Sequence, residues 1–408
     1  MRILQLVLAP RLSGAEMLVK GIAIGHRRGG HTVGIASLLP AEDDFADAAR
    51  ELAAQQVACL FPSKRNDRFA RLVFLYRTIR HFAPDIVFAH TTIPALYVRA
   101  LPLSVPIVFV MHSGMNDFTE NRRLWWAERL LARRARALIG VTQRNVDQYA
   151  ATIGSHGESF VVPNGVDVER FRIGRTRNDA ENVAYADDAE DFENAEARRM
   201  KRIVQIGRYM PEKGQLDTVR AFYEVLNVTE ALKLNRGPSE RSQPQQRPQR
   251  RPEPFLHLCG VIEDRGYHAR VVSLVETLGI AANVRIEGPR TDVPDLLAQA
   301  DVFAMPSRFE AHSIGFLEAL ASGIPIVANA IGGFAFARGY PSVCLVDTED
   351  AGRFGRALAD ALEQPRCARP LDGLTLEETA GRYLEIARRV VTGCGRANAP
   401  RREAASRR

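Results

Sequence analysis

A first group of residues that could do chemistry lies in the segment 306–333, PSRFEAHSIGFLEALASGIPIVANAIGG, where Glu310 and Glu318 stand eight residues apart. We expect Glu310 to lie in a loop after a strand at 302–304, and Glu318 to lie on a helix that begins near Ser313 and Ile314 and ends before Gly323. The first backbone N–H groups of such a helix bind anions, and a phosphate is a natural ligand for them. The two carboxylates could then accept hydrogen bonds from sugar or ribose hydroxyls beside that phosphate.

A second group lies in IGRYMPEKG, residues 206–214, directly after an expected strand at 202–206. This places Arg208 and Lys213 at the carboxyl edge of a sheet, where open α/β folds bind ligands. The bidentate arginine and the compact charge of the lysine together suit a diphosphate. Taken alone, each group also has an ordinary explanation, because a pair of glutamates at this spacing occurs by chance and two cations in a turn are usually solvated.

Two histidines stand at the ends of buried strands. His112 follows the apolar run 107–111, and His90 follows the run 85–89. A histidine at such a place could donate a hydrogen bond to a sugar hydroxyl or stabilise developing charge. A structural role is the more frequent one for a single histidine at a strand end, and His312 is left undecided.

The elements that must position these residues are short β-rich runs, each followed by a helical stretch. Continuous Val/Ile/Leu runs between helices are typical of a parallel sheet that is covered on both faces. The pattern predicts an α/β fold with two Rossmann-like, doubly wound domains and a boundary near 163–171. The runs are 3–8, 33–38, 85–89, 107–111 and 137–141 in the first half, and 202–206, 255–258, 284–286, 302–304, 326–328 and 343–346 in the second.

The length of 408 residues also indicates two domains. We expect a first domain at 1–165, a linker with an acidic insertion at 166–200, a second domain at 201–375, and a C-terminal helix with a basic tail at 376–408. Residues 235–254 are rich in Pro, Gln and Arg and are expected to form a disordered insertion. They lack the interleaved aromatic residues that base stacking would need, so nucleic acid is not an expected partner.

The composition indicates where in the cell the protein is expected and which cofactors it is expected to bind. The five cysteines are scattered, which argues against a disulfide framework or a zinc site. No Asp-x-Asp pair occurs, so we expect no metal ion and no other cofactor. The first residues do not resemble a signal peptide, and the longest apolar stretch, 100–111, is shorter than the roughly 20 residues that cross a bilayer. We therefore expect a cytoplasmic protein.

Two stretches combine apolar and cationic side chains, 63–81 and 122–136. Both could lie on an anionic bilayer, which would place the protein peripherally on the inner face of the cytoplasmic membrane. The alternative is that the apolar face belongs to the core and the arginines are solvated. The sequence leaves both interpretations open.

Four motifs occur in the order that is found in glycosyltransferases of family 4 with the GT-B fold, and the chain resembles that family as far as about Arg389. The motifs are SGAE (13–16), VVPNGVD (161–167) with Phe171, GR-x4-KG (207–214) and E-x7-E (310–318). The resemblance implies transfer of a sugar from a nucleotide-sugar donor to a glycan or lipid-linked acceptor, with retention of the anomeric configuration. It further implies a donor-binding second domain, an acceptor-binding first domain and a cleft between them.

The resemblance also implies roles for individual residues. It implies that the catalytic residues are His112, near the anomeric carbon, and Glu310, at the donor sugar. It also implies that His90 helps to shape the acceptor-binding side of the cleft. Ser13 replaces the first glycine of the usual loop, and Ala311-His312-Ser313 replaces a stretch that often contains glycine. The donor-binding residues are Gly14, Arg208, Lys213, Ser313, Ile314 and Glu318.

The common roles of the family suggest a hexosyltransferase of bacterial envelope polysaccharide or lipopolysaccharide synthesis. Two alternatives are another GT-B enzyme, such as a sugar-nucleotide epimerase, and a nonenzymatic sensor or scaffold that binds a nucleotide sugar. A nicotinamide dehydrogenase is not expected, because no G-x-G-x-x-G follows the first strand.

Overall fold

The computed structural model describes residues 1–112, 117–172, 200–235 and 254–398. The contacts divide the chain into two compact units, each of which is described by itself. Unit 1 comprises Met1–Val166, Ala311–Ile314 and Asp372–Arg408, and unit 2 comprises Asp167–Glu310 and Gly315–Leu371. Nearly all of the expected acidic and Pro/Gln/Arg-rich insertions, and the end of the basic tail, lie outside the described residues.

Unit 1 contains a seven-stranded parallel sheet with the strand order β3-β2-β1-β4-β5-β6-β7. The chain runs outward from β1 to β3 and then returns to β4, so the switch point of the sheet lies between β1 and β4. Ligands of doubly wound folds bind at such points. The strands are β1 (Arg2–Val7), β2 (Thr32–Ser37), β3 (Ala58–Leu60), β4 (Ile86–His90), β5 (Ile107–Met111), β6 (Ala137–Gly140) and β7 (Glu158–Val161).

Helices cover this sheet. Those that lie between the strands in sequence are α1 (Gly14–Arg28), α2 (Ala46–Ala54), α3 (Arg68–Phe82), α4 (Thr92–Ala100), α5 (Asp117–Glu120), α6 (Arg122–Leu131) and α7 (Gln143–Thr152). The helix α1 begins at Gly14, directly after Ser13.

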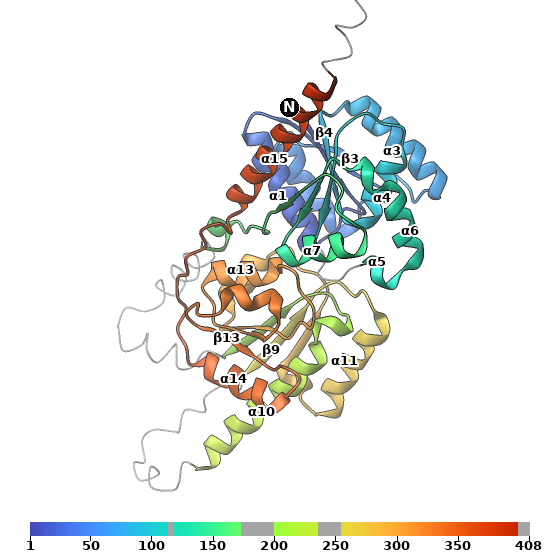
Figure 1. Cartoon of the computed structure of the whole chain (residues 1–408). Helices are drawn as coiled ribbons and strands as arrows, with labels where there is room; N and C mark the ends of the chain where they lie inside the picture. The colour runs from blue at the N-terminus through green and yellow to red at the C-terminus, as the bar shows by residue number, and fades with distance from the viewer. Residues whose placement is uncertain (113–116, 173–199, 236–253, 399–408) are drawn as a thin grey trace, which may run out of the picture. The chain divides into compact units, whose positions relative to one another are not determined.

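The last helix, α15 (Leu376–Asn398), returns to unit 1 and lies along α1 (Figure 1). A Cβ atom at Gly21 would come within 2.6 Å of the Leu376 side chain, and one at Gly25 would come within 3.3 Å of Ala380. The two glycines therefore let the helices approach closely. Tyr383 of α15 is buried in the same apolar cluster as Ile3, so α15 forms part of the core of unit 1.

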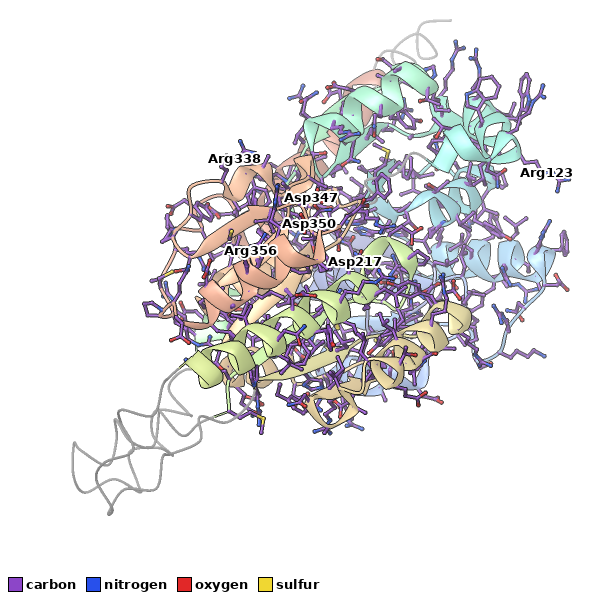
Figure 2. All side chains as sticks on the ribbon, turned by 90° about the horizontal axis from the view of Figure 1, so that it is seen from below. Arg123, Asp217, Arg338, Asp347, Asp350 and Arg356 are labelled. Atoms are coloured by element: carbon purple, nitrogen blue, oxygen red, sulfur yellow. The ribbon has the colours of Figure 1, made fainter. Side chains whose placement is uncertain are left out.

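Unit 2 contains a six-stranded parallel sheet with the order β10-β9-β8-β11-β12-β13 and a switch point between β8 and β11. Asp350 caps the helix α14 (Ala351–Leu362) by accepting a hydrogen bond from the backbone N–H of Arg353 at 2.9 Å, and Figure 2 labels Asp350 and Arg356 at this helix. The strands are β8 (Arg202–Ile206), β9 (Phe255–Cys259), β10 (Val284–Glu287), β11 (Val302–Met305), β12 (Ile326–Asn329) and β13 (Val343–Val346). The helices are α10 (Gln215–Asn235), α11 (Arg265–Thr277), α12 (Val293–Gln299), α13 (Ile314–Ser322) and α14, and the first residue of α13, Ile314, is counted in unit 1.

The predicted fold class, two Rossmann-like α/β units with parallel sheets, is confirmed. The prediction omitted β3 and β7, which have three and four residues and are not fully buried. Among the residues that the structure describes, no helix has the length and apolar content that crossing a bilayer would need.

Candidate active site

The loops that follow β8 and β11 lie on the two sides of the switch point in unit 2. After β8, the chain makes a 3-10 turn at Pro211–Lys213, where the side-chain nitrogen of Gln205 donates to the backbone oxygen of Lys213 at 2.7 Å. Gly214 then has a φ of +67°, and a Cβ atom there would lie 2.8 Å from the backbone oxygen of Pro306 in the β11 loop. Glycine is therefore needed where the two loops touch.

The same two loops bring Lys213 and Glu310 together. The Lys213 ammonium forms an ion pair with the Glu310 carboxylate, and only 17% and 11% of these side chains are exposed. Arg308, in the same loop as Glu310, pairs with Asp217 at 3.3 Å in the first turn of α10, where Figure 2 labels Asp217. The cation that the sequence assigns to a diphosphate thus contacts the carboxylate that it assigns to the donor sugar.

Arg208 lies at the same carboxyl edge but is more exposed. Its guanidinium is 3.6 Å from the Glu263 carboxylate, and each side chain is 38% exposed, so this pair is weak. The Gln215 side-chain nitrogen donates to the backbone oxygen of Arg208 at 2.9 Å and so fixes the loop. A Cβ atom at Gly260 would lie 2.0 Å from the backbone oxygen of Gly207, which makes Gly260 a further requirement of this loop. Sequence reasoning did not single out Gln215 or Gly260.

Glu318 lies on α13, which begins at Ile314 and ends at Ser322, as the sequence predicted. Burial raises the pKa of Glu318 to about 7, and the Arg170 guanidinium opposes this shift only in part. Its carboxyl group therefore changes charge near neutral pH. A second missed glycine, Gly333, lies against the backbone of Glu310, where a Cβ atom would be 2.2 Å from the carbonyl oxygen.

The other predicted residues, Gly14, His90, His112, Ser313 and Ile314, belong to unit 1. Gly14 is the first residue of α1. The preceding Ser13 gives its hydroxyl hydrogen to the Glu16 carboxylate and makes no side-chain cap of the helix. A Cβ atom at Gly14 would come within 3.1 Å of the Ile314 side chain, so a larger residue would crowd this loop.

His90 and His112 contact each other, which the sequence did not reveal. The Nδ1 atom of His90 is 2.8 Å from Nε2 of His112, and the Nε2 atom of His90 is 2.7 Å from the side-chain oxygen of Gln5. The strands β4 and β5 pair with His90 opposite Val110, which places the two histidines at neighbouring strand ends. The pairing of two strand-end histidines was the signal that sequence reasoning could have used.

Both of these histidines are neutral at pH 7. Burial lowers the pKa of His90 well below its usual value, and the neighbouring His112 lowers it further. Burial also lowers the pKa of His112 to about 4, although the Asn164 side chain partly opposes this shift. The sequence assigned no role to His312. Its backbone oxygen accepts a hydrogen bond from the Asn164 side chain at 2.7 Å, and burial lowers the pKa of its ring to about 4. A neutral imidazole can accept or donate a hydrogen bond but cannot neutralise an anion.

Within the described part of the chain, no three His, Cys, Asp or Glu side chains gather in a way that could hold a metal ion. The expectation that the protein works without a metal ion stays a prediction.

Comparison with known proteins identifies the two halves of the chain. Residues 12–170 match the model of Glycosyltransferase Family 4, and residues 200–364 match that of Glycosyl transferases group 1. D-inositol 3-phosphate glycosyltransferase 2 of Catenulispora acidiphila is 26% identical over 276 residues, which are 64% of this chain and 58% of that protein. The lipopolysaccharide core biosynthesis mannosyltransferase LpsB of Rhizobium meliloti is 24% identical over 252 residues, 60% of this chain and 57% of that protein. The chain thus spans less than two thirds of the length of these relatives.

A solved structure agrees in fold. The structure of HepE from Anabaena in complex with UDP and glucose superposes with a TM-score of 0.66 at 16% identity, over 97% of this chain and 99% of that one. The chain belongs to the GT-B glycosyltransferases, with a family 4 domain followed by a group 1 domain.

Proposed function

We propose that the protein is a retaining hexosyltransferase that moves a sugar from a nucleoside diphosphate sugar to a hydroxyl group of a glycan or lipid-linked acceptor. The observation that carries this proposal is the ion pair between Lys213 and Glu310 at the switch point of unit 2. It presents a cation for a phosphate beside a carboxylate that can accept hydrogen bonds from sugar hydroxyls. The LpsB relative supports an envelope polysaccharide such as lipopolysaccharide as the product.

In this proposal, different groups bind the diphosphate, the ribose and the sugar of the donor. Lys213 and Arg208 neutralise the diphosphate, with the backbone at the start of α13 as a further anion-binding group. Glu318 accepts hydrogen bonds from the ribose, and Glu310 accepts hydrogen bonds from the sugar. The cations stabilise the charge that grows on the diphosphate as it leaves, so the reaction needs no metal ion.

The reaction breaks the bond between the anomeric carbon and the diphosphate oxygen and forms one to the acceptor oxygen. Retention requires that the acceptor attacks the face that the diphosphate leaves. The proton of the acceptor hydroxyl then passes to the departing diphosphate. His112 lies beside the reacting sugar in this proposal.

We also propose that α3 and α6 contact an anionic membrane surface, on the cytoplasmic side. Leu75 and Ile79 of α3 are buried in the core, but Phe69 is 76% exposed. On α6, Trp126 is 57% exposed and Leu130 is 80% exposed. The helix α4 packs against both α3 and α6, so the exposed apolar side chains lie on neighbouring helices (Figure 1). Exposed cations accompany them, including Arg123, which Figure 2 shows extending away from the ribbon.

The function is tested by binding and by turnover. Calorimetry with a panel of UDP-, GDP- and ADP-sugars should find one donor whose binding weakens in Lys213→Ala and is unchanged in Lys64→Ala, an exposed control. Transfer or slow hydrolysis of that donor, followed by NMR of the sugar released, should give a first product with the anomeric configuration of the donor. An inverted first product would contradict retention, and a protein that binds the donor but turns over none of it would be a sensor.

A further inference from the structure

We propose that Gln5 and His90 are positioning residues that hold the ring proton of His112 on Nε2, so that His112 presents the lone pair of Nδ1 as a hydrogen-bond acceptor for a sugar hydroxyl. The part played by the sugar rests on the proposed function. The arrangement of protons does not, because it follows from contacts inside unit 1.

The three side chains come from three adjacent strands. Gln5 lies within β1, His90 is the last residue of β4, and His112 directly follows β5, in the strand order β1-β4-β5. The Gln5 side-chain oxygen is 2.7 Å from His90 Nε2, and His90 Nδ1 is 2.8 Å from His112 Nε2. Gln5 is fully buried and His90 is only 2% exposed, so water does not compete for these contacts.

The direction of each hydrogen bond follows from the orientation of the Gln5 amide, whose oxygen faces His90 and can only accept, while its nitrogen is buried without a hydrogen-bond partner among the described residues. The Nε2 atom of His90 must therefore carry the proton. A neutral imidazole has one ring proton, so Nδ1 of His90 carries a lone pair and accepts from Nε2 of His112. His112 has then used its own proton, and its Nδ1 atom carries a lone pair.

The reverse arrangement would have His112 donate from Nδ1 and accept at Nε2. His90 would then have to donate from Nδ1 and accept at Nε2, which requires the Gln5 amide to be turned over so that its nitrogen faces His90. The ¹⁵N spectra described below distinguish the two orientations. Burial favours the neutral state of both rings. Only neutral rings fix the donor and the acceptor in the hydrogen-bonded series Gln5–His90–His112, because a protonated histidine would donate from both nitrogens.

A neighbouring aromatic ring packs against His90. The ring of Tyr383, from α15, lies nearly parallel to that of His90, at 10° and with 6.3 Å between the ring centroids. Among the described residues, no hydrogen bond of good geometry reaches Nδ1 of His112, although the Asn164 side chain lies close enough to the ring to raise its pKa. The Nδ1 atom is buried, so a sugar hydroxyl can reach it only when the side chains that cover it move. An acceptor of this kind orients a hydroxyl group but does not neutralise a phosphate, which separates the role of His112 from that of Lys213.

The first test reads the protons directly. The full chain is labelled with ¹⁵N-histidine, and long-range ¹⁵N–¹H correlation spectra at pH 7.5 report which ring nitrogen carries the proton. Spectra of His90→Asn and His112→Asn assign the two sets of signals. We expect both rings to be protonated at Nε2. A His112 ring that is protonated at Nδ1 would overturn the proposal.

The second test removes the acceptor for the His112 proton. In His90→Leu, the His112 ring is free to change tautomer, so we expect kcat to fall by roughly 5- to 150-fold while the affinity for UDP, or whichever nucleoside diphosphate binds, is unchanged. His90→Asn places a side-chain oxygen near the position of Nδ1 and should restore most of kcat and the Nε2 proton of His112. If both variants lose the same activity and His112 keeps its proton on Nε2 in both, the positioning role is wrong.

If His90→Leu does not fold, Gln5→Met tests the chain from its other end. Without the amide oxygen, His90 can adopt either tautomer, and the His112 signals should show a mixture; an unchanged His112 spectrum would refute the role of Gln5. A wild-type protein that turns over no donor refutes the proposed function alone, because the spectra still decide where the proton lies.

Discussion

The Lys213 ammonium and the Glu310 carboxylate, from loops 97 residues apart, neutralise each other in a largely buried ion pair. A diphosphate that binds Lys213 must therefore compete with Glu310. When a sugar accompanies the diphosphate, its hydroxyl groups can take over the carboxylate that Lys213 releases. The pair thus favours an intact nucleotide sugar over a free nucleotide, since only the intact donor satisfies both partners.

This competition predicts opposite effects for one substitution on two ligands. In Glu310→Gln, Lys213 is no longer neutralised, so a free nucleoside diphosphate should bind more tightly than to the wild type. The intact nucleotide sugar should lose part of its affinity, because a charged acceptor for its hydroxyl groups is lost. Calorimetry with both ligands measures the two changes, and weaker binding of both would show that Glu310 does not compete for Lys213.

The matching substitution, Lys213→Ala, should weaken binding of both ligands by roughly 10- to 150-fold, the range expected for one charged hydrogen bond. The effect on the free nucleoside diphosphate should be larger in the Glu310→Gln background if the pair is split during binding, because Lys213 then binds the phosphate without first leaving Glu310. A double-mutant cycle of the four proteins measures this coupling. Full additivity would mean that the diphosphate binds without separating the pair.

The pKa of Glu318, near 7, predicts that nucleotide binding depends on pH. Only the ionised carboxylate accepts hydrogen bonds with both oxygens, so binding to the ribose favours deprotonation. Below pH 7 the group is protonated in the free protein, and affinity should fall by up to about tenfold for each further pH unit. Above pH 8 the contribution of Glu318 should level off. Glu318→Gln should flatten this dependence; if it leaves the pH profile unchanged, another group titrates.

Arg99 and Glu128 form an ion pair whose side chains are fully buried, with nitrogen–oxygen distances of 2.7 and 2.6 Å, and the Tyr149 hydroxyl also donates to Glu128 at 2.6 Å. Glu128→Ala should destabilise unit 1 by about 3–5 kcal/mol, because it leaves the Arg99 charge buried without its partner. Arg50→Ala, which removes an exposed ion pair with Asp47, should cost less than about 1 kcal/mol. Urea denaturation followed by tryptophan fluorescence, which reports on unit 1, compares the two variants.

The membrane proposal predicts binding to vesicles of anionic lipid at low salt and release at high salt. Replacing Arg68, Arg77 and Arg80 with Gln should weaken co-sedimentation most at low salt. Phe69→Ser together with Trp126→Ser should remove the binding that remains at high salt. Phe336→Ser, an exposed aromatic residue of unit 2, is the control. Binding that survives both sets of changes would place the membrane contact elsewhere.

Buried apolar runs were enough to predict most strands of both sheets and the fold class, because a parallel sheet covered on both faces leaves a strong local signal. The strand-end position of Arg208, Lys213 and Glu310 followed from the same pattern. The hydrogen-bonded chain from Gln5 to His112 could not be predicted in this way. It depends on the order of the strands in the sheet, and Gln5 in the run RILQLV gave no sign of its partner.

The packing of α15 on unit 1 could not be predicted from the local sequence pattern either. Its apolar face predicts a helix that packs on something, but not which unit it covers. The signal that could have helped is Gly21 and Gly25 of α1, one helical turn apart, which make room for Leu376 and Ala380. Two glycines on one helix face indicate that another helix packs closely there, but they do not show which one. The helix that packs on them lies more than 350 residues later in the sequence.

The return of α15 to unit 1 has a consequence for the order in which the protein folds on the ribosome. About 205 residues, 167–371, separate the first and the last segment of unit 1, and of these only Ala311–Ile314 belong to that unit. At 5–20 residues per second, their synthesis takes roughly 10–40 s, during which the apolar surface of α1 and β1 that α15 later covers stays open. Unit 2 can complete its own core in that time, although it is made second. The nascent chain therefore exposes a site for a chaperone until its last helix has left the ribosome, and the unit that is begun first is finished last.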